Sequence, residues 1–154
     1  MGVIAFEIER TIGAPVELVF ARLADIEGYH AWMPEKGSIL RRTRQTSPGE
    51  PGVGTTFHDD TTYGPTPGEI VEFEPPHTLV FHWWDKTKAG RLKLEGWPGY
   101  ALVRQDGGTT LVRHHARLQT YGVYRLTGPV LRRIALRERT VTVDALKASF
   151  ETSR

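Results

Sequence analysis

The stretch that decides the fold is GPVLRRIALRERTVTVDALKASFE, from Gly128 to Glu151. It contains no Gly or Pro after Pro129, and its less polar residues recur every three or four positions, the spacing of one face of an α-helix. The β-branched residues from Thr140 to Val143 lower the local helix propensity but leave this spacing intact. The stretch therefore predicts one long amphipathic helix. Its apolar stripe contains Leu131, Ile134, Ala135, Glu138, Val141, Thr142, Ala145 and Leu146.

Glu138 is the unusual member of this stripe. A carboxylate that faces a closed apolar core is costly unless it is paired or protonated, whereas a pocket that contains water tolerates it. The alternative is that Glu138 lies at the edge of the stripe and pairs with an arginine at the surface. The basic residues of the same helix favour a solvated face. They are Arg132, Arg133, Arg137 and Arg139.

The N-terminal part of the chain predicts one strand and two short helices. Apolar and polar residues alternate from Val3 to Arg10, the pattern of a half-buried strand. The segment from Pro15 to Ala24 has helical spacing, with its proline in the first turn. Asp25 is placed to cap a second short helix, which Gly28 weakens and Pro34 ends.

From Ser38 to Leu118 the chain consists of short alternating segments separated by turns rich in Gly, Pro and Asp. This pattern predicts an antiparallel meander of about six strands, with a hairpin at Asp106-Gly107-Gly108. The predicted strands are SILRRTRQ, TTFHDDTTY, EIVEFE, TLVFHWW, RLKLEGWPGYALVR and TTLVRHHARL, and YGPTPG is among the predicted turns.

Together these elements predict an α+β fold in one domain, residues 1–154. A curved antiparallel sheet of about seven strands would wrap around the long C-terminal helix, and the two short helices after strand 1 would close one end. If the sheet curves strongly, one helix cannot fill its concave face. We therefore expect an internal cavity between sheet and helix.

Composition excludes several classes of function. The 154 residues are 39% hydrophobic and 25% charged, with a net charge of +2, which indicates an ordinary globular protein without a nucleic-acid-binding face. No apolar run is long enough for stable membrane insertion, and the N-terminus has no signal-peptide pattern, so a cytoplasmic location is expected. The absence of cysteine excludes disulfides and thiol catalysis. No phosphate-binding glycine loop is present, and no cofactor is expected.

The chain resembles the START and birch-pollen-allergen superfamily, also called SRPBCC, and within it the polyketide cyclase/dehydrase-like proteins. The resemblance covers nearly the whole chain in order and implies the helix-grip fold. It rests on Ala14-Pro15, Val19-Phe20, Leu23, Asp25, Trp32, Pro34, the stretch Gly52 to Phe57, Glu69 to Pro76, Leu79, Phe81, Trp83, Gly108 to Leu111, Leu146-Lys147 and Glu151. It further implies that Tyr29 and Trp32 lie at one end of a cavity, although Trp32 alternatively packs only under the loop before Pro34.

Strand alternation predicts which side chains face this cavity. Phe57, Asp59, Phe81 and Trp83 belong to the more apolar faces of their strands, and Tyr100 is assigned with them, although its strand does not decide the direction. His114 is favoured over His115 as the inward histidine, but a bulge would reverse that choice. The expected ligand-binding residues are Tyr29, Trp32, Phe57, Asp59, Phe81, Trp83, Tyr100, His114, Leu131, Ile134, Glu138 and Val141.

Two functions fit these expectations. The first is binding of a small hydrophobic or aromatic molecule in the cavity. The second is a cofactor-independent cyclase or dehydratase in which His114, Glu138 and Asp59 are candidate catalytic residues. A metal site built from His58, Asp59, Asp60, His114 and His115 is disfavoured, because alternation sends neighbouring residues to opposite faces. Protein partners, including a homodimer, are left open, with His82 and Trp84 as an outward patch.

Overall fold

The computed structural model describes residues 2–151 and consists of one curved sheet, one long helix and four short helical segments. The strands are β1 (Gly2–Ile12), β2 (Leu40–Gln45), β3 (Thr56–Thr61), β4 (Gly64–Glu74), β5 (Thr78–Lys86), β6 (Leu92–Gln105) and β7 (Thr109–Thr120). The helical segments are α1 (Val16–Ala24), η1 (Ile26–Ala31), η2 (Asp106–Gly108), η3 (Gly122–Thr127) and α2 (Gly128–Glu151).

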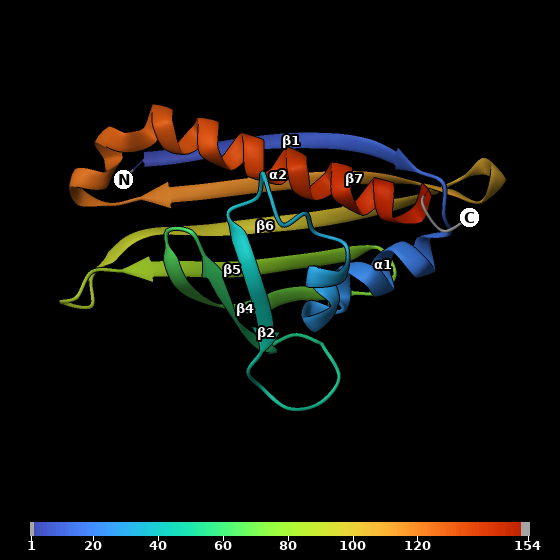
Figure 1. The fold of residues 1–154 in the computed structure, drawn as a ribbon, viewed down its shortest axis with the longest axis horizontal. Helices are drawn as coiled ribbons and strands as arrows, with labels where there is room; N and C mark the ends of the chain where they lie inside the picture. Colours follow the sequence, from blue (N-terminus) through green and yellow to red (C-terminus); the bar gives the residue numbers. More distant parts are fainter. Residues whose placement is uncertain (1, 152–154) are drawn as a thin grey trace.

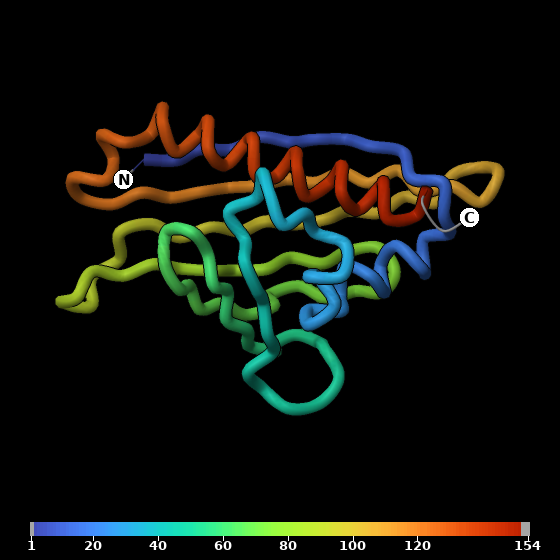
Figure 2. The backbone as a smooth tube through the Cα atoms, viewed as in Figure 1, coloured from blue at the N-terminus to red at the C-terminus, as the bar shows by residue number. Residues whose placement is uncertain are grey.

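The sheet has the order β1-β7-β6-β5-β4-β3-β2, and every neighbouring pair is antiparallel. Figure 1 shows α2 running along the β1–β7 edge, with α1 beside the C-terminal end of α2. The connection between β2 and β3, residues 46–55, forms a wide loop that projects away from α2 (Figure 2). The predicted helix-grip arrangement of sheet and helix is confirmed.

The packed core occupies one end of the space between sheet and helices. It joins the apolar face of α1 and the first residue of η1 to the middle strands and to the C-terminal half of α2, where Leu146 is fully buried. Val143 is also fully buried, and α2 packs mainly against β1. The core members are Ile12, Ala14, Val16, Val19, Phe20, Leu23, Ala24, Ile26, Phe57, Ile70, Leu79, Phe81, Tyr100, Leu102, Val112 and Leu146.

Two local predictions were wrong. The segment YGPTPG was expected to be a turn, but β4 already begins at Gly64 and includes Pro65 and Pro67. These prolines pair with β3, while the partnership of β4 with β5 starts only at Gly68. The first residues of β4 therefore pair with a strand on one side only. At such an edge a proline, which has no N–H, is tolerated.

The second correction concerns the helix after α1. The segment η1 is a 3₁₀ helix, and the side chain of Asp25 makes no capping hydrogen bond to it. In the described part of the chain, no helix combines the length and the apolar character that crossing a membrane takes.

Candidate functional site

A cavity of about 670 Å³ lies between the concave face of the sheet and the N-terminal half of α2. α2 is anchored by the buried Val143 and Leu146 near its C-terminal end, whereas the apolar lining residues of its N-terminal half, Val130, Leu131, Ile134 and Ala135, are exposed or half-buried. Three exposed residues mark the mouth: Tyr63, Leu126 and Val130 line the cavity and are 70%, 86% and 62% exposed.

The walls of the cavity are mostly apolar and come from alternate residues of the strands. The inward side chains include Phe57, Phe81, Trp83, Pro98, Tyr100 and Leu118. From α2 the apolar lining residues are Val130, Leu131, Ile134 and Ala135. Such a chamber excludes most water from a ligand and favours apolar contents.

Two glycines make room for the aromatic part of this wall. Phe57 lies opposite Gly68, and a Cβ atom at Gly68 would come within 2.3 Å of the Phe57 ring. Trp83 lies opposite Gly96 in the same way, with a corresponding distance of 2.6 Å. The rings therefore rest on bare backbone, where any other residue would displace them.

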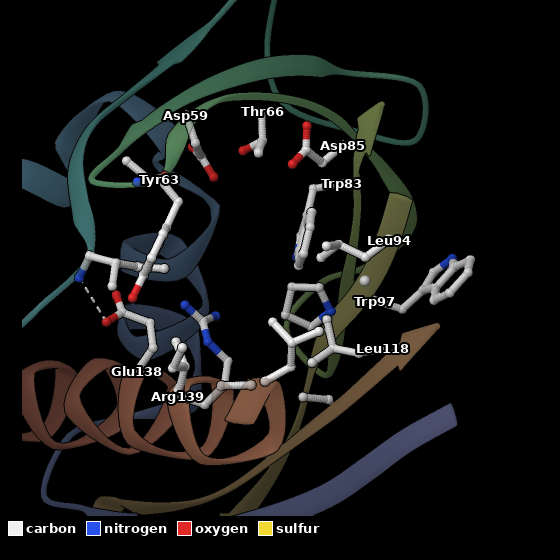
Figure 3. A pocket seen from close by; sticks show the side chains of 18 of the residues that line it. Asp59, Tyr63, Thr66, Trp83, Asp85, Leu94, Trp97, Leu118, Glu138 and Arg139 are labelled. Carbon is white, nitrogen blue, oxygen red and sulfur yellow. Dashed lines mark hydrogen bonds between the residues drawn. The ribbon is translucent and has the colours of Figure 1, made fainter. Parts of the chain in front are cut away.

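Glu138 lines the cavity and is buried, and it ties α2 to the segment before β2. Ser38 Oγ donates a hydrogen bond of 2.5 Å to Glu138 Oε1. The backbone N–H of Ile39 donates one of 2.9 Å to Oε2, drawn as a dashed line in Figure 3. These two donors stabilise the carboxylate away from bulk water. The alternative of a surface pair between Glu138 and an arginine was wrong.

Asp59 projects into the cavity from β3, on the wall opposite α2 (Figure 3). Burial in these apolar surroundings raises the pKa of its carboxyl from 3.8 to about 6. A hydrogen bond with the Thr43 side chain and the positive charge of Arg139 act in the opposite direction but do not cancel the effect of burial. Asp59 therefore exchanges its proton near neutral pH.

Arg139 also projects into the cavity, from the α2 wall (Figure 3). Its interpretation as part of the solvated basic face was wrong. The other three arginines of that face, Arg132, Arg133 and Arg137, are exposed, whereas Arg139 is half-buried. Its charge acts on Asp59, Tyr29, Tyr100 and His114. No feature of the helical spacing separates it from its neighbours, because the sheet curves around more than one face of α2.

Two tyrosines supply hydroxyl groups at the inner end of the cavity. Tyr29 and Tyr100 both line it, and burial raises the pKa of both phenols. The Tyr29 hydroxyl donates a hydrogen bond of 2.7 Å to the backbone oxygen of Leu23. Both phenols therefore stay protonated at neutral pH.

Three of the expected site residues, His114, Trp32 and Val141, do not line the cavity. His114 is fully buried and stacks on Tyr100, with ring centroids 4.2 Å apart, and its Nδ1 donates to Gly99 O at 2.8 Å. Burial lowers the pKa of His114 well below its usual value, so it is neutral. Trp32 packs on Tyr29 and Val141 lies elsewhere on α2, and neither lines the cavity. Tyr29, Phe57, Asp59, Phe81, Trp83, Tyr100, Leu131, Ile134 and Glu138 do.

The opposite face of the sheet carries a separate cluster around Trp97. His82 stacks on Trp97 at 4.7 Å between centroids, and its Nε2 lies 2.7 Å from Glu95 Oε1. Arg117 lies 4.3 Å above the same ring, and Trp97 points away from the cavity in Figure 3. Within residues 2–151, no three His, Cys, Asp or Glu side chains gather in a way that would hold a metal ion.

We predict that Glu138→Ala lowers the free energy of unfolding by roughly 1–3 kcal/mol, because the Ser38 hydroxyl and the Ile39 N–H lose their acceptor in a buried place. Urea denaturation measures this. Arg137→Ala, an exposed neighbour on α2, is the matched control and should change stability by no more than about 0.5 kcal/mol. An equal loss of unfolding free energy in the two variants would contradict the conclusion that the hydrogen bonds of Glu138 to Ser38 and Ile39 stabilise the fold.

The raised pKa of Asp59 predicts that the stability of the protein depends on pH. An unfolded Asp titrates near 3.8 and Asp59 in the folded protein near 6, so between these values the folded state holds the proton more firmly. The free energy of unfolding therefore falls as the pH rises through this window, and above it the loss caused by Asp59 is complete and no longer changes with pH. Asp59→Asn should raise stability at pH 7.5 by up to about 3 kcal/mol. Denaturation at pH 4.5 and 7.5 tests this.

The control for Asp59→Asn is Asp60→Asn. Asp60 is the next residue of the same strand, its side chain is 53% exposed, and it lies 3.3 Å from His58. Asp60→Asn should leave the difference in stability between the two pH values as in the unmodified protein. If Asp59→Asn behaves like Asp60→Asn, the carboxyl of Asp59 is not buried as described.

Known proteins share this fold at low sequence identity. The Zhui aromatase/cyclase from Streptomyces sp. R1128 superposes with a TM-score of 0.79 at 12% identity, over 97% of this chain and 94% of that chain. A START superfamily protein from Mycobacterium smegmatis gives 0.70 at 14% identity, over 99% of both chains. Ara h 8.0201 gives 0.70 at 16% identity, over 99% of this chain and all of the other. No curated protein is a significant match.

The sequence itself matches one protein family, over residues 3–151. That family is described as polyketide cyclase / dehydrase and lipid transport. The match spans nearly all of the described structure, including every strand that builds the cavity and the whole of α2. This chain belongs to the polyketide cyclase / dehydrase and lipid transport family, a branch of the SRPBCC superfamily.

Proposed function

We propose that this protein binds a small hydrophobic or aromatic molecule in the cavity between the sheet and α2. The observation that carries the proposal is the cavity itself, whose volume of about 670 Å³ falls within the usual range of ligand pockets, about 300–1,000 Å³. Its lining is mostly apolar, with polar groups that include Asp59, Glu138 and Arg139, and its mouth is open between Tyr63 and Leu126. The family's lipid-transport members support the same role.

A pair of adjacent substitutions tests this proposal. Ala135 lines the cavity, whereas Leu136 is 38% exposed on the outside of α2. Ala135→Trp should fill the chamber and weaken binding of N-phenyl-1-naphthylamine, a neutral apolar probe, at least about tenfold. Leu136→Trp should bind the probe as the unmodified protein does. The enhancement of probe fluorescence on titration measures both affinities.

Two results would contradict the binding proposal. In the first, the unmodified protein shows no saturable enhancement of the fluorescence of N-phenyl-1-naphthylamine. In the second, Ala135→Trp binds the probe as tightly as Leu136→Trp, which would place the binding site outside the cavity. Circular dichroism of both variants establishes that the fold is intact before the comparison.

A second function, proton-transfer catalysis, is favoured by Asp59. A carboxyl with a pKa of about 6 inside an apolar chamber exchanges a proton readily near neutral pH, as a general acid or base requires. His114 is closed off behind Tyr100, and Glu138 is held by two donors, so Asp59 is the remaining candidate of the three. A protein described as an aromatase/cyclase shares the fold, which supports cyclase-like chemistry as this second function.

The test uses 1-phenylbutane-1,3-dione, a β-diketone, in deuterated buffer. Asp59 as a base removes a proton from the carbon between the two carbonyls, and the carbon then takes up deuterium. We predict that Asp59→Asn lowers the exchange rate catalysed by the protein at least about 100-fold, while Asp60→Asn leaves it unchanged. Proton NMR follows the exchange. Equal rates for both variants and the unmodified protein would remove Asp59 from any such reaction.

A further inference from the structure

The charged groups that line the cavity differ in how well the protein itself satisfies them. Asp85 and Lys93 pair with each other, with 3.4 Å between Asp85 Oδ2 and Lys93 Nζ. Glu138 accepts hydrogen bonds from Ser38 and Ile39. These three groups therefore have partners without a ligand.

Arg139 has no comparable partner. Within residues 2–151, no carboxylate oxygen lies within the 4.0 Å of an ion pair with its guanidinium. The hydrogen bond that it makes there is a long one, with 3.3 Å between Nη2 and the hydroxyl of Thr142 on the next turn of α2. A guanidinium carries five N–H donors, so most of its capacity is unused by the protein.

The position of Arg139 also limits how far water can satisfy its unused N–H donors. The side chain is half-buried and points from α2 into the chamber, so bulk water satisfies it less than it does Arg137 on the outside of the helix (Figure 3). Asp59 lies on the opposite wall, outside ion-pair distance of Arg139, and burial raises the pKa of its carboxyl to about 6 although the charge of Arg139 acts to lower it. The open space between these two walls is where a ligand would lie.

The length of the chamber follows from the helix. Val130 lies at the mouth, and Arg139 is nine residues further along α2, which corresponds to about 14 Å of helix axis. Between them the lining residues of α2 are apolar as far as Glu138, which precedes Arg139, and they are Leu131, Ile134 and Ala135. An apolar body that entered from the mouth would therefore bring its leading end to the guanidinium.

We propose that the cavity selects organic acids: molecules with a flat or extended apolar body and one terminal carboxylate or similarly acidic group, which pairs with the guanidinium of Arg139. This inference rests on the proposed binding function and names its ligand class. A carboxylate matches the two parallel N–H donors of a guanidinium and receives charge-assisted hydrogen bonds. The ligand thus supplies the partner that the protein does not.

The experiment compares three ligands of nearly the same shape by isothermal titration calorimetry at pH 7.5. They are naphthalene-2-carboxylate, its neutral isostere naphthalene-2-carboxamide, and the cation naphthalen-2-ylmethylammonium. We expect the carboxylate to bind about 10- to 100-fold more tightly than the carboxamide, the gain that hydrogen bonds to a charged group provide. The ammonium ligand should bind more weakly than both, because it meets the charge of Arg139.

Arg139→Gln should abolish the preference for the carboxylate, whereas Arg137→Gln, the same change on the exposed side of α2, should keep it. Arg139→Lys keeps the charge but not the paired donors and should retain part of the preference. If Arg139→Gln fails to fold, the comparison of carboxylate with carboxamide in the unmodified protein still decides the matter.

The outcomes separate this inference from the proposed function. Equal binding of carboxylate and carboxamide overturns the selection of acids and leaves binding of apolar molecules standing. Preference for the ammonium ligand overturns it too and points to Asp59 as the governing charge. Failure of all three ligands, and of N-phenyl-1-naphthylamine, to bind overturns both proposals.

Discussion

The cavity depends on how α2 is anchored. Val143 and Leu146, both fully buried, hold the C-terminal half of the helix in place, and Leu146 belongs to the packed core at one end of the sheet. The N-terminal half has no such apolar anchors, and the tie from Glu138 to Ser38 and Ile39 holds it across the opening instead. A helix with apolar anchors along its whole length would settle onto the sheet and remove the chamber. Uneven anchoring therefore creates the site.

The two carboxyls of the chamber show how surroundings assign roles to identical groups. Glu138 meets two donors at its position on α2 and holds the structure together. Asp59 lies in apolar surroundings with weaker compensation, so burial raises its pKa and leaves it able to exchange a proton. Arg139 completes the set as a cation without a protein partner at ion-pair distance in residues 2–151. Fixed apolar walls with few convergent polar groups are typical of selective ligand pockets.

Much of the fold could be predicted from the sequence, because periodicity reports burial directly. The alternation of apolar and polar residues predicted the strands, and the spacing of apolar residues from Leu131 to Leu146 predicted the long helix. The start of β4 was missed, because Pro65 and Pro67 are typical of a turn. The residues of the site were harder to predict. Arg139 has the same local sequence character as Arg137, and only the curvature of the sheet decides which of the two it encloses. The burial of His114 behind Tyr100 likewise depends on ring stacking across strands, which strand parity does not encode.

The two glycines that contact the aromatic rings of the wall influence how the size of the cavity can change in evolution. Gly96 and Gly68 lie against the rings of Trp83 and Phe57. The width of the cavity therefore depends on these two glycines, which lie behind the rings that line it. One methyl group added at Gly96 would meet the Trp83 indole and force it to shift, which changes the shape of the interior without altering any residue on α2. Descendants of this protein could thus change the size of the molecules they accommodate by backbone-level substitutions, while the charges that orient those molecules stay in place.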